Sequence, residues 1–224
     1  MTIGLIIFDC DGVIADSEVL SATVLIDLLA DVGIAITPAD VRRDFLGRSF
    51  PTVADTVRRR FGHPLPASFE MDYRSRLLDR FAAELRPTPG VMAVLDGLRH
   101  PACIATSSSP QRVGRTLQVL GLAERFAGRV FTASQVAQGK PAPDLFLFAA
   151  RQMGHAPHRT LVIEDSGPGI AAALAAGMRV LHYGGGAHLR GQDRPDASQG
   201  VQSFDTWSEF PHLLNDLQAG ASIP

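Results

Sequence analysis

Two pairs of acidic residues each follow an apolar run, which indicates that the folded chain brings carboxylates together. Asp9 and Asp11 follow the run "LIIF", and Glu164 and Asp165 end the run "TLVIED". Neighbouring carboxylates in a site screened from water repel one another strongly unless a cation lies between them. Such a set of oxygen ligands suits Mg²⁺, which prefers hard oxygens in octahedral geometry and leaves positions for water and phosphate. The spacing therefore predicts a divalent-metal site with these four carboxylates as candidate ligands.

Two further segments could supply donors to an anion that carboxylates alone would repel. In "ATSSS", the hydroxyl groups of Thr106 and Ser108 and the backbone amides of Ser107 and Ser108 come just before a helix start and could surround phosphoryl oxygens. Lys140 in "GKPAPD" is held between a glycine and a proline, which restricts the positions of its ammonium group. Taken singly, these residues would be a turn and a surface lysine. Together with the acidic pairs, they predict a site that handles a phosphate group.

Five apolar runs predict the strands that would position these residues. They cover residues 5–9, 103–107, 129–133, 160–165 and 179–183. Their continuous apolar character, with helical patterns between most of them, is typical of parallel strands that are covered on both faces. The expected fold class is α/β, with a doubly wound parallel sheet.

Residues 17–86 break this alternation, because they carry amphipathic helix patterns and no convincing strand. Helices inserted just after the first strand would lie over the carboxyl ends of the strands, where open α/β sheets bind their ligands. We therefore expect a helical cap at 17–86 and a core formed by residues 1–16 and 87–224.

Composition limits the possible partners. The chain of 224 residues has a formal net charge of −2, so it has no general attraction for nucleic acid or for an anionic membrane. The apolar start is too short to span a bilayer and lacks the pattern of a secretion signal, so a cytoplasmic protein is expected. Cys10 and Cys103 lie beside strand-like residues and are expected to be reduced thiols in the core. The patterns do not indicate an oligomer, and we expect a monomer.

Four motifs, taken in order, resemble those of the haloacid dehalogenase-like (HAD) hydrolase superfamily: "DCDGV", "TSS", "GKPAPD" and "VIEDSGPGI". The resemblance extends over nearly the whole chain. It is to the branch with a helical cap, which includes β-phosphoglucomutase and phosphoglycolate-type phosphatases. The resemblance implies a Rossmann-like core with an inserted α-helical cap. It also implies Mg²⁺-dependent hydrolysis of a small phosphomonoester, expected to be a sugar or polyol phosphate.

The resemblance further implies a catalytic role for four residues. Asp9 would be the nucleophile that forms an aspartyl phosphate. Asp11 would be the general acid and then the general base, with its backbone carbonyl group on the metal. Thr106 would bind phosphate, and Lys140 would neutralise the charge on Asp9 and on the phosphoryl group.

For the metal, the resemblance implies direct coordination by Asp165, with Glu164 in or near the coordination sphere. Arg48, in the cap, would contact the substrate. The residues expected to bind substrate or phosphate are Gly12, Ser107, Ser108 and Arg48.

A phosphomutase of the same branch is the nearest alternative. Such mutases keep a histidine in the first cap helix where this chain has Ser21, and an arginine in a cap loop where it has Phe50. Both departures favour hydrolysis. Arg74 and Arg76 would either meet a second anionic group of the substrate or lie on a solvated helix face.

Two other classes of protein fit parts of the pattern. A phosphoacceptor signalling domain also combines an acidic pocket, a hydroxyl residue and a lysine, but Asp11, two residues beyond the acceptor, favours turnover over a lasting phosphoryl group. The segment "GPGIAA" fits a permissive dinucleotide-binding fingerprint. Pro168 offers no amide hydrogen there, and Glu164 and Asp165 would repel a pyrophosphate. The motifs together therefore favour a phosphatase.

Overall fold

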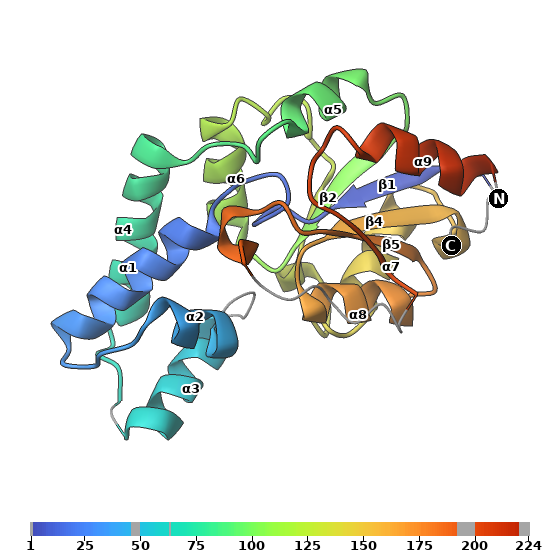
Figure 1. The fold of residues 1–224 in the computed structure, drawn as a ribbon. Helices are drawn as coiled ribbons and strands as arrows, with labels where there is room; N and C mark the ends of the chain where they lie inside the picture. Colours follow the sequence, from blue (N-terminus) through green and yellow to red (C-terminus); the bar gives the residue numbers. More distant parts are fainter. Residues whose placement is uncertain (1, 46–49, 63, 192–199, 220–224) are drawn as a thin grey trace.

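The computed structural model describes residues 2–45, 50–62, 64–191 and 200–219 and contains a six-stranded parallel sheet (Figure 1). Along the chain, the strands are β1 Leu5–Phe8, β2 Ala102–Thr106, β3 Val130–Thr132, β4 Thr160–Glu164, β5 Arg179–Tyr183 and β6 Gln202–Phe204. Their order across the sheet is β3-β2-β1-β4-β5-β6, which is a doubly wound order. The predicted α/β fold class is confirmed.

All five predicted strands form, with ends that differ from the prediction by one residue at most. The sixth strand, β6, lies outside the prediction. It is a short strand at the edge of the sheet, and its half-buried Gln202 and Ser203 do not give the continuous apolar run that marks the others.

Strand β1 lies at the centre of the sheet, between β2 and β4. Its carboxyl end is level with Ile104 of β2 and Ile163 of β4. The residues that come next, among them Asp9, Thr106 and Glu164, therefore converge on one edge of the sheet.

Helices cover both faces of the sheet, because alternate residues of a strand point to opposite sides. The helices around the sheet are α5 Val91–Gly97, α6 Pro110–Val119, α7 Asp144–Gln152, α8 Gly167–Ala175 and α9 Phe210–Ala219. Three short 3-10 helices lie among them: η1 Ala133–Gln135, η2 Pro157–Arg159 and η3 Ala187–Leu189. On one face, Ile6 and Phe8 of β1 share an apolar cluster with residues of α5, α6 and α9. On the other face, Leu5 and Ile7 pack with residues of α7 and α8. Burial on both faces is what the continuous apolar strands predict.

Four helices lie between β1 and α5 in the sequence, and we call them the cap helices. They are α1 Glu18–Asp31, α2 Pro38–Asp44, α3 Phe50–Phe61 and α4 Phe69–Glu84. They bury an apolar cluster of their own, which includes Leu29, Val57 and Phe81. Figure 1 shows the cap helices gathered at one end of the molecule, on the left and in blue to green. As expected, the described part of residues 17–86 contains no strand.

The two connections between the cap helices and the rest of the chain run side by side. The backbone N–H of Asp16 donates to the carbonyl oxygen of Arg86 (3.0 Å), and Ala15 forms an isolated antiparallel bridge with Pro87. The helical block is thus joined to the sheet at one place.

The thiols of Cys10 and Cys103 are buried and free, as the sequence predicts. Every helix within the described ranges is too short or too polar to cross a membrane.

Candidate active site

Three carboxylates meet at the edge of the sheet where β1 and β4 end. The side chains of Asp9, Glu164 and Asp165 are buried, and each offers an oxygen atom that lies within 4.8 Å of the others. We call these three residues the acidic cluster. The parallel pairing of neighbouring strands produces it, because Asp9 follows β1, Glu164 ends β4 and Asp165 follows β4. The fourth predicted carboxylate, that of Asp11, is not part of this group.

Lys140 lies against the acidic cluster and is the only lysine in the sequence. Its Nζ atom is 2.5 Å from Asp9 Oδ1 and 2.6 Å from Glu164 Oε1, and its side chain is only 4% exposed. Burial disfavours the charged amine, but attraction to the two carboxylates outweighs burial and raises the pKa of Lys140. A compact ammonium group suits the narrow space between two carboxylate oxygens better than a planar guanidinium would. The structure thus places a charged lysine beside Asp9.

The surroundings of Glu164 favour its ionised form. Its Oε2 atom accepts hydrogen bonds from the backbone amides of Asp165 and Ser166, both at 2.8 Å, and from Ser166 Oγ at 2.9 Å. Burial opposes ionisation, but Lys140 and these hydrogen bonds outweigh it and lower the pKa of Glu164.

One ammonium group does not balance the charge of three carboxylates. Burial raises the pKa of Asp9, and repulsion from Glu164 and Asp165 adds to that effect against the attraction of Lys140. Burial and then the charge of Glu164 also raise the pKa of Asp165. Buried hard oxygens that carry excess negative charge fit a divalent cation such as Mg²⁺.

Gly12 allows the chain to pass directly beside the acidic cluster. Its φ is +81°, and a Cβ atom there would lie 1.9 Å from Asp165 Oδ2. The sequence predicts Gly12 as a phosphate-binding residue, and the structure places it against Asp165.

His188 is a neighbour of the cluster that the sequence patterns do not indicate. It lies in η3, and its Nε2 atom is 2.9 Å from Asp165 Oδ2, without hydrogen-bond geometry. Burial lowers the pKa of His188 and favours the neutral ring.

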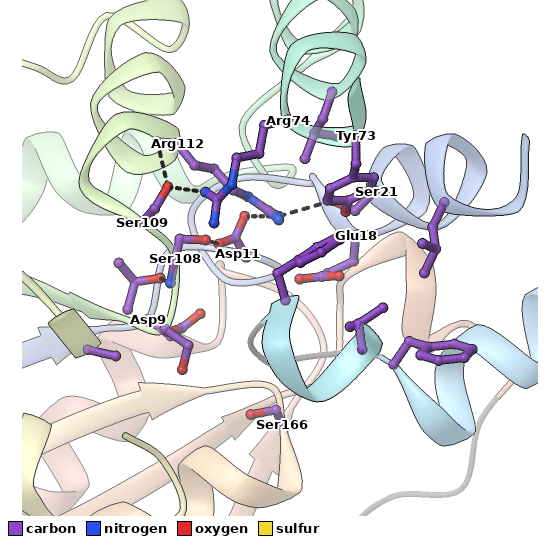
Figure 2. Close-up of a pocket in the computed structure, with 18 of the residues that line it drawn as sticks. Asp9, Asp11, Glu18, Ser21, Tyr73, Arg74, Ser108, Ser109, Arg112 and Ser166 are labelled. Atoms are coloured by element: carbon purple, nitrogen blue, oxygen red, sulfur yellow. Dashed lines mark hydrogen bonds and ion pairs between the residues drawn. The ribbon is translucent and has the colours of Figure 1, made fainter. Parts of the chain in front are cut away.

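The carboxylate of Asp11 points toward a second group of residues (Figure 2). Its Oδ1 atom accepts hydrogen bonds from Ser17 Oγ (2.6 Å) and Arg112 Nη2 (2.7 Å), and its Oδ2 atom accepts one from Ser108 Oγ (2.5 Å). Burial would raise the pKa of Asp11, but Arg112 and the hydroxyl donors outweigh burial and lower it. These donors explain why the side chain of Asp11 turns away from the acidic cluster.

Arg112 is the main residue of the site that sequence reasoning misses. It lies in the first turn of α6, and its Nη2 atom also donates to Ser21 Oγ of α1 (3.0 Å). Its guanidinium carbon is 5.4 Å from the centre of the Phe81 ring in α4. A cation in the first turn of a helix is unfavourable for the helix dipole, so its presence could have indicated an acidic partner.

The loop after β2 borders the same space. Thr106, Ser107 and Ser108 line a cavity of about 680 Å³ between the end of the sheet and the cap helices. The Thr106 hydroxyl is buried and accepts a hydrogen bond from the backbone amide of Ser108 (3.1 Å). This amide, expected as a phosphate donor, therefore has a partner within the loop. Ser109 caps α6, since its Oγ atom accepts a hydrogen bond from the backbone amide of Arg112 at 3.3 Å.

Two residues of the cap helices add buried polar groups to the cavity. Glu18 and Tyr73 line it beside Ser21 and Arg74, as Figure 2 shows. Burial, and then repulsion from Asp11, raise the pKa of Glu18. A protonated Glu18 could donate a hydrogen bond to a substrate hydroxyl group.

The structure places Arg74 and Arg76, whose roles the sequence leaves open, in different surroundings. Arg74 lines the cavity and donates from Nη1 to Ser109 Oγ (2.9 Å). Arg76 instead pairs with Asp31 at 2.9 Å on an exposed surface. The predicted contact at Arg48 lies outside the described residues.

Comparisons with known proteins indicate the family. The model of the haloacid dehalogenase-like hydrolases matches residues 3–177. The 6-phosphogluconate phosphatase of Escherichia coli is 26% identical, in an alignment that covers 93% of this chain and 93% of that protein. The fructose-1-phosphate phosphatase of the same organism is 33% identical, in an alignment that covers 77% of this chain and 92% of that protein. The crystal structure of a conserved haloacid dehalogenase-like protein of unknown function from Agrobacterium tumefaciens is 32% identical, covers 96% of this chain and 99% of its own, and superimposes with a TM-score of 0.81.

The geometry of the site agrees with these comparisons. The site combines a buried carboxylate beside a lysine, further carboxylates that suit a cation, and a hydroxyl-bearing loop. These are the kinds of group that phosphoryl transfer requires for positioning and for stabilising charge. The chain belongs to the haloacid dehalogenase-like hydrolase family and is one of its phosphatases.

Proposed function

We propose that this phosphatase hydrolyses a small phosphomonoester in a Mg²⁺-dependent reaction, with the phosphoryl group carried transiently on Asp9. The observation that supports this proposal is the position of Asp9, which lines the cavity in contact with the charged Lys140 and with the acidic cluster. The names of the two Escherichia coli relatives support a sugar or polyol phosphate as the substrate.

The acidic cluster provides the residues that would hold the metal. Asp9 and Asp165 would coordinate Mg²⁺ with the backbone carbonyl group of Asp11, and Glu164 would lie in or near the coordination sphere. The bound ion would supply positive charge to the phosphoryl oxygens and to the attacking carboxylate. Burial, and then repulsion among the carboxylates, raise the pKa values of Asp9 and Asp165, and a cation would relieve that repulsion, which supports this assignment.

In the first half of the reaction, a carboxylate oxygen of Asp9 forms a bond to phosphorus while the bond from phosphorus to the ester oxygen breaks. Asp11 gives its proton to the departing alkoxide. Lys140 balances the charge of Asp9, and the hydroxyl groups of Thr106 and Ser108 bind phosphoryl oxygens.

In the second half, Asp11 takes a proton from a water molecule whose oxygen attacks phosphorus. The bond between phosphorus and Asp9 breaks, and inorganic phosphate leaves. Hydrogen bonds from Arg112 and two serine hydroxyl groups lower the pKa of Asp11 and favour the ionised state that a base requires. To act as the acid, Asp11 would have to exchange one of these donors for the ester oxygen and carry a proton.

The arrangement of the chain supports a cap domain at 17–86 on a core of 1–16 and 87–224, and closure of the cap would exclude bulk water from the cavity. Arg48 would contact the substrate from the cap. We propose a cytoplasmic enzyme that acts as a monomer.

The surroundings of Ser21 support hydrolysis rather than mutase action. Its hydroxyl donates to the carbonyl oxygen of Ser17 (2.9 Å) and accepts from Arg112 (3.0 Å). A serine hydroxyl cannot exchange protons near neutral pH as a histidine does.

Release of inorganic phosphate from a panel of sugar and polyol phosphates tests the proposal. We expect turnover that EDTA abolishes, that Mg²⁺ restores, and that Asp9→Asn reduces to background. Full turnover without a divalent metal, or in Asp9→Asn, would refute it. Isomerisation of a hexose phosphate primed by a hexose 1,6-bisphosphate would instead identify a mutase, and a stable phosphoprotein without turnover would identify a signalling domain.

A further inference from the structure

The cavity above the acidic cluster has a second wall that is apolar. This wall is formed by all four cap helices and the residue that follows α2, and its members include Leu25, Val41, Phe45, Phe50, Val53 and Leu77. Most of them are buried in the apolar cluster of the cap helices, and Phe50 is half-buried. The wall is therefore part of the cap interior rather than a set of exposed side chains.

The polar side chains that the cap helices contribute to the cavity form a belt beside Asp11. Figure 2 shows this belt between the cap helices and the start of α6. Within the described part of the chain, the cap helices contribute only Glu18, Ser21, Tyr73 and Arg74 to it as polar side chains. Several of their polar atoms already have partners, since Arg74 binds Glu70 and Ser21 binds Arg112. The belt could bind the first few atoms of a leaving group, but the described residues of the wall beyond it have apolar side chains, which offer a ligand no hydrogen bonds.

The cavity is large enough for a ligand to reach beyond the polar belt to the apolar wall. A volume of about 680 Å³ lies within the range of roughly 300–1,000 Å³ that is usual for sites that enclose a whole organic ligand. A phosphate group and the first carbons of a leaving group would occupy only the part beside the acidic cluster and the belt. Hydroxyl groups placed against the apolar wall would lose their hydrogen bonds to water without replacement, whereas hydrocarbon placed there would be stabilised by leaving water.

We propose that the preferred substrate is a phosphomonoester whose leaving group ends in hydrocarbon, either an alkyl chain or a ring, which packs against the apolar wall. The belt binds the atoms next to the ester oxygen, and Leu25, Val41 and Val53 contact the apolar end. This inference rests on the proposed phosphatase function and ranks its substrates. Sugar and polyol phosphates are hydrolysed, but more slowly than an ester whose leaving group ends in hydrocarbon, because their hydroxyl groups gain no hydrogen bonds from the apolar wall.

The test compares two sets of primary-alcohol phosphates whose leaving groups differ in polarity. Hexyl phosphate and 2-phenylethyl phosphate carry hydrocarbon, and ribitol 5-phosphate and xylitol 5-phosphate carry hydroxyl groups. All four are esters of primary alcohols, so differences in kcat/KM report mainly on recognition. We expect kcat/KM for the hydrocarbon set to exceed that for the polyol set by about tenfold or more, since a single methylene in an apolar pocket can change kcat/KM by about that factor.

A pair of isosteric variants in α3 locates the source of the preference. Val53→Thr places a hydroxyl group in the apolar wall, and Val57→Thr places one in the cap interior one turn away, at a residue that does not line the cavity. We expect Val53→Thr to reduce the ratio of the two kcat/KM values by about tenfold and Val57→Thr to leave that ratio unchanged. Because each ratio compares two substrates on one protein, partial unfolding of a variant cancels.

The outcomes separate this inference from the proposed function. Equal values, or a preference for the polyol phosphates, would overturn the inference and leave a Mg²⁺-dependent phosphatase. A hydrocarbon preference that both variants reduce equally would also overturn it, because the wall would not be its source. If neither set were hydrolysed with Mg²⁺, the proposed function would fail, and this inference with it.

Discussion

Lys140→Met removes the ammonium group that joins Asp9 to Glu164 and keeps an unbranched side chain of similar length. Both contacts are buried, at 2.5 and 2.6 Å. Removing one partner of a buried ion pair costs about 3–5 kcal/mol, because the other charge is left without compensation. We therefore expect the metal-free variant to lose about 3–5 kcal/mol of its free energy of unfolding, with the lower value if a carboxyl group takes up a proton.

Magnesium should restore part of that loss. A ligand that binds only the folded state stabilises it by about 2.7 kcal/mol at a hundredfold excess over its Kd. The acidic cluster of the variant is more negative by one charge, so Mg²⁺ should stabilise the variant at least as much as the wild type. Turnover should still fall by about 10²–10³-fold, the usual effect of losing one group that stabilises charge in the transition state.

Urea unfolding with EDTA and with Mg²⁺, followed by the fluorescence of the single tryptophan, measures both effects. Trp207 is buried and should report unfolding of the core. Arg115→Met, at an exposed position of α6, is the control for loss of a positive charge and should change neither stability nor turnover. A Lys140→Met variant as stable as the wild type in EDTA, or with normal turnover, would refute the role assigned to this lysine.

Three further predictions follow from particular contacts. Gly12→Ala would place Cβ 1.9 Å from a carboxylate oxygen of Asp165 and should weaken Mg²⁺ binding in calorimetric titration. Gly33→Ala, at nearly the same φ but with open space around it, should cost only the backbone strain of about 1–3 kcal/mol. Equal Mg²⁺ affinities of the two variants would contradict a close approach of Gly12 to the acidic cluster. Arg112→Gln removes a hydrogen bond from a charged donor to Asp11, the proposed general acid, and should lower the rate of phosphate release by about 10–100-fold. Arg115→Gln should leave the rate within about twofold, and equal rates for the two variants would contradict a positioning role for Arg112. Burial raises the pKa of Cys103 to about 12, so this thiol should react with a thiol-selective disulfide reagent only after unfolding, and fast reaction of the native protein at neutral pH would show that the core is open there.

The parts of the site that follow from local patterns could be predicted from the sequence. Asp9 and Asp165 each follow a continuous apolar run, and such runs pair as parallel strands whose ends share one edge. The helix start at Pro110 and its Ser109 cap also depend only on neighbouring residues. These local rules are sufficient for the fold class and for the acidic cluster.

The parts that depend on contacts distant in sequence could not be predicted in this way. Arg112 lies 101 positions from Asp11, and its role appears only when α6 and the cap helices are placed around the same cavity. The orientation of the Asp11 side chain depends on that arginine and on Ser108, so spacing alone could not separate it from the acidic cluster. His188 reaches Asp165 because β5 lies beside β4 in the sheet.

The most direct measurement of the central claim is to locate the phosphoryl group on the enzyme during turnover. The protein is mixed with Mg²⁺ and a hydrolysed substrate, quenched in acid within the first turnover, and mapped by peptide mass spectrometry. The account predicts one phosphoryl group on Asp9, absent without Mg²⁺ and in Asp9→Asn. A phosphoryl group on another residue, or phosphate release at full rate from Asp9→Asn, would contradict it.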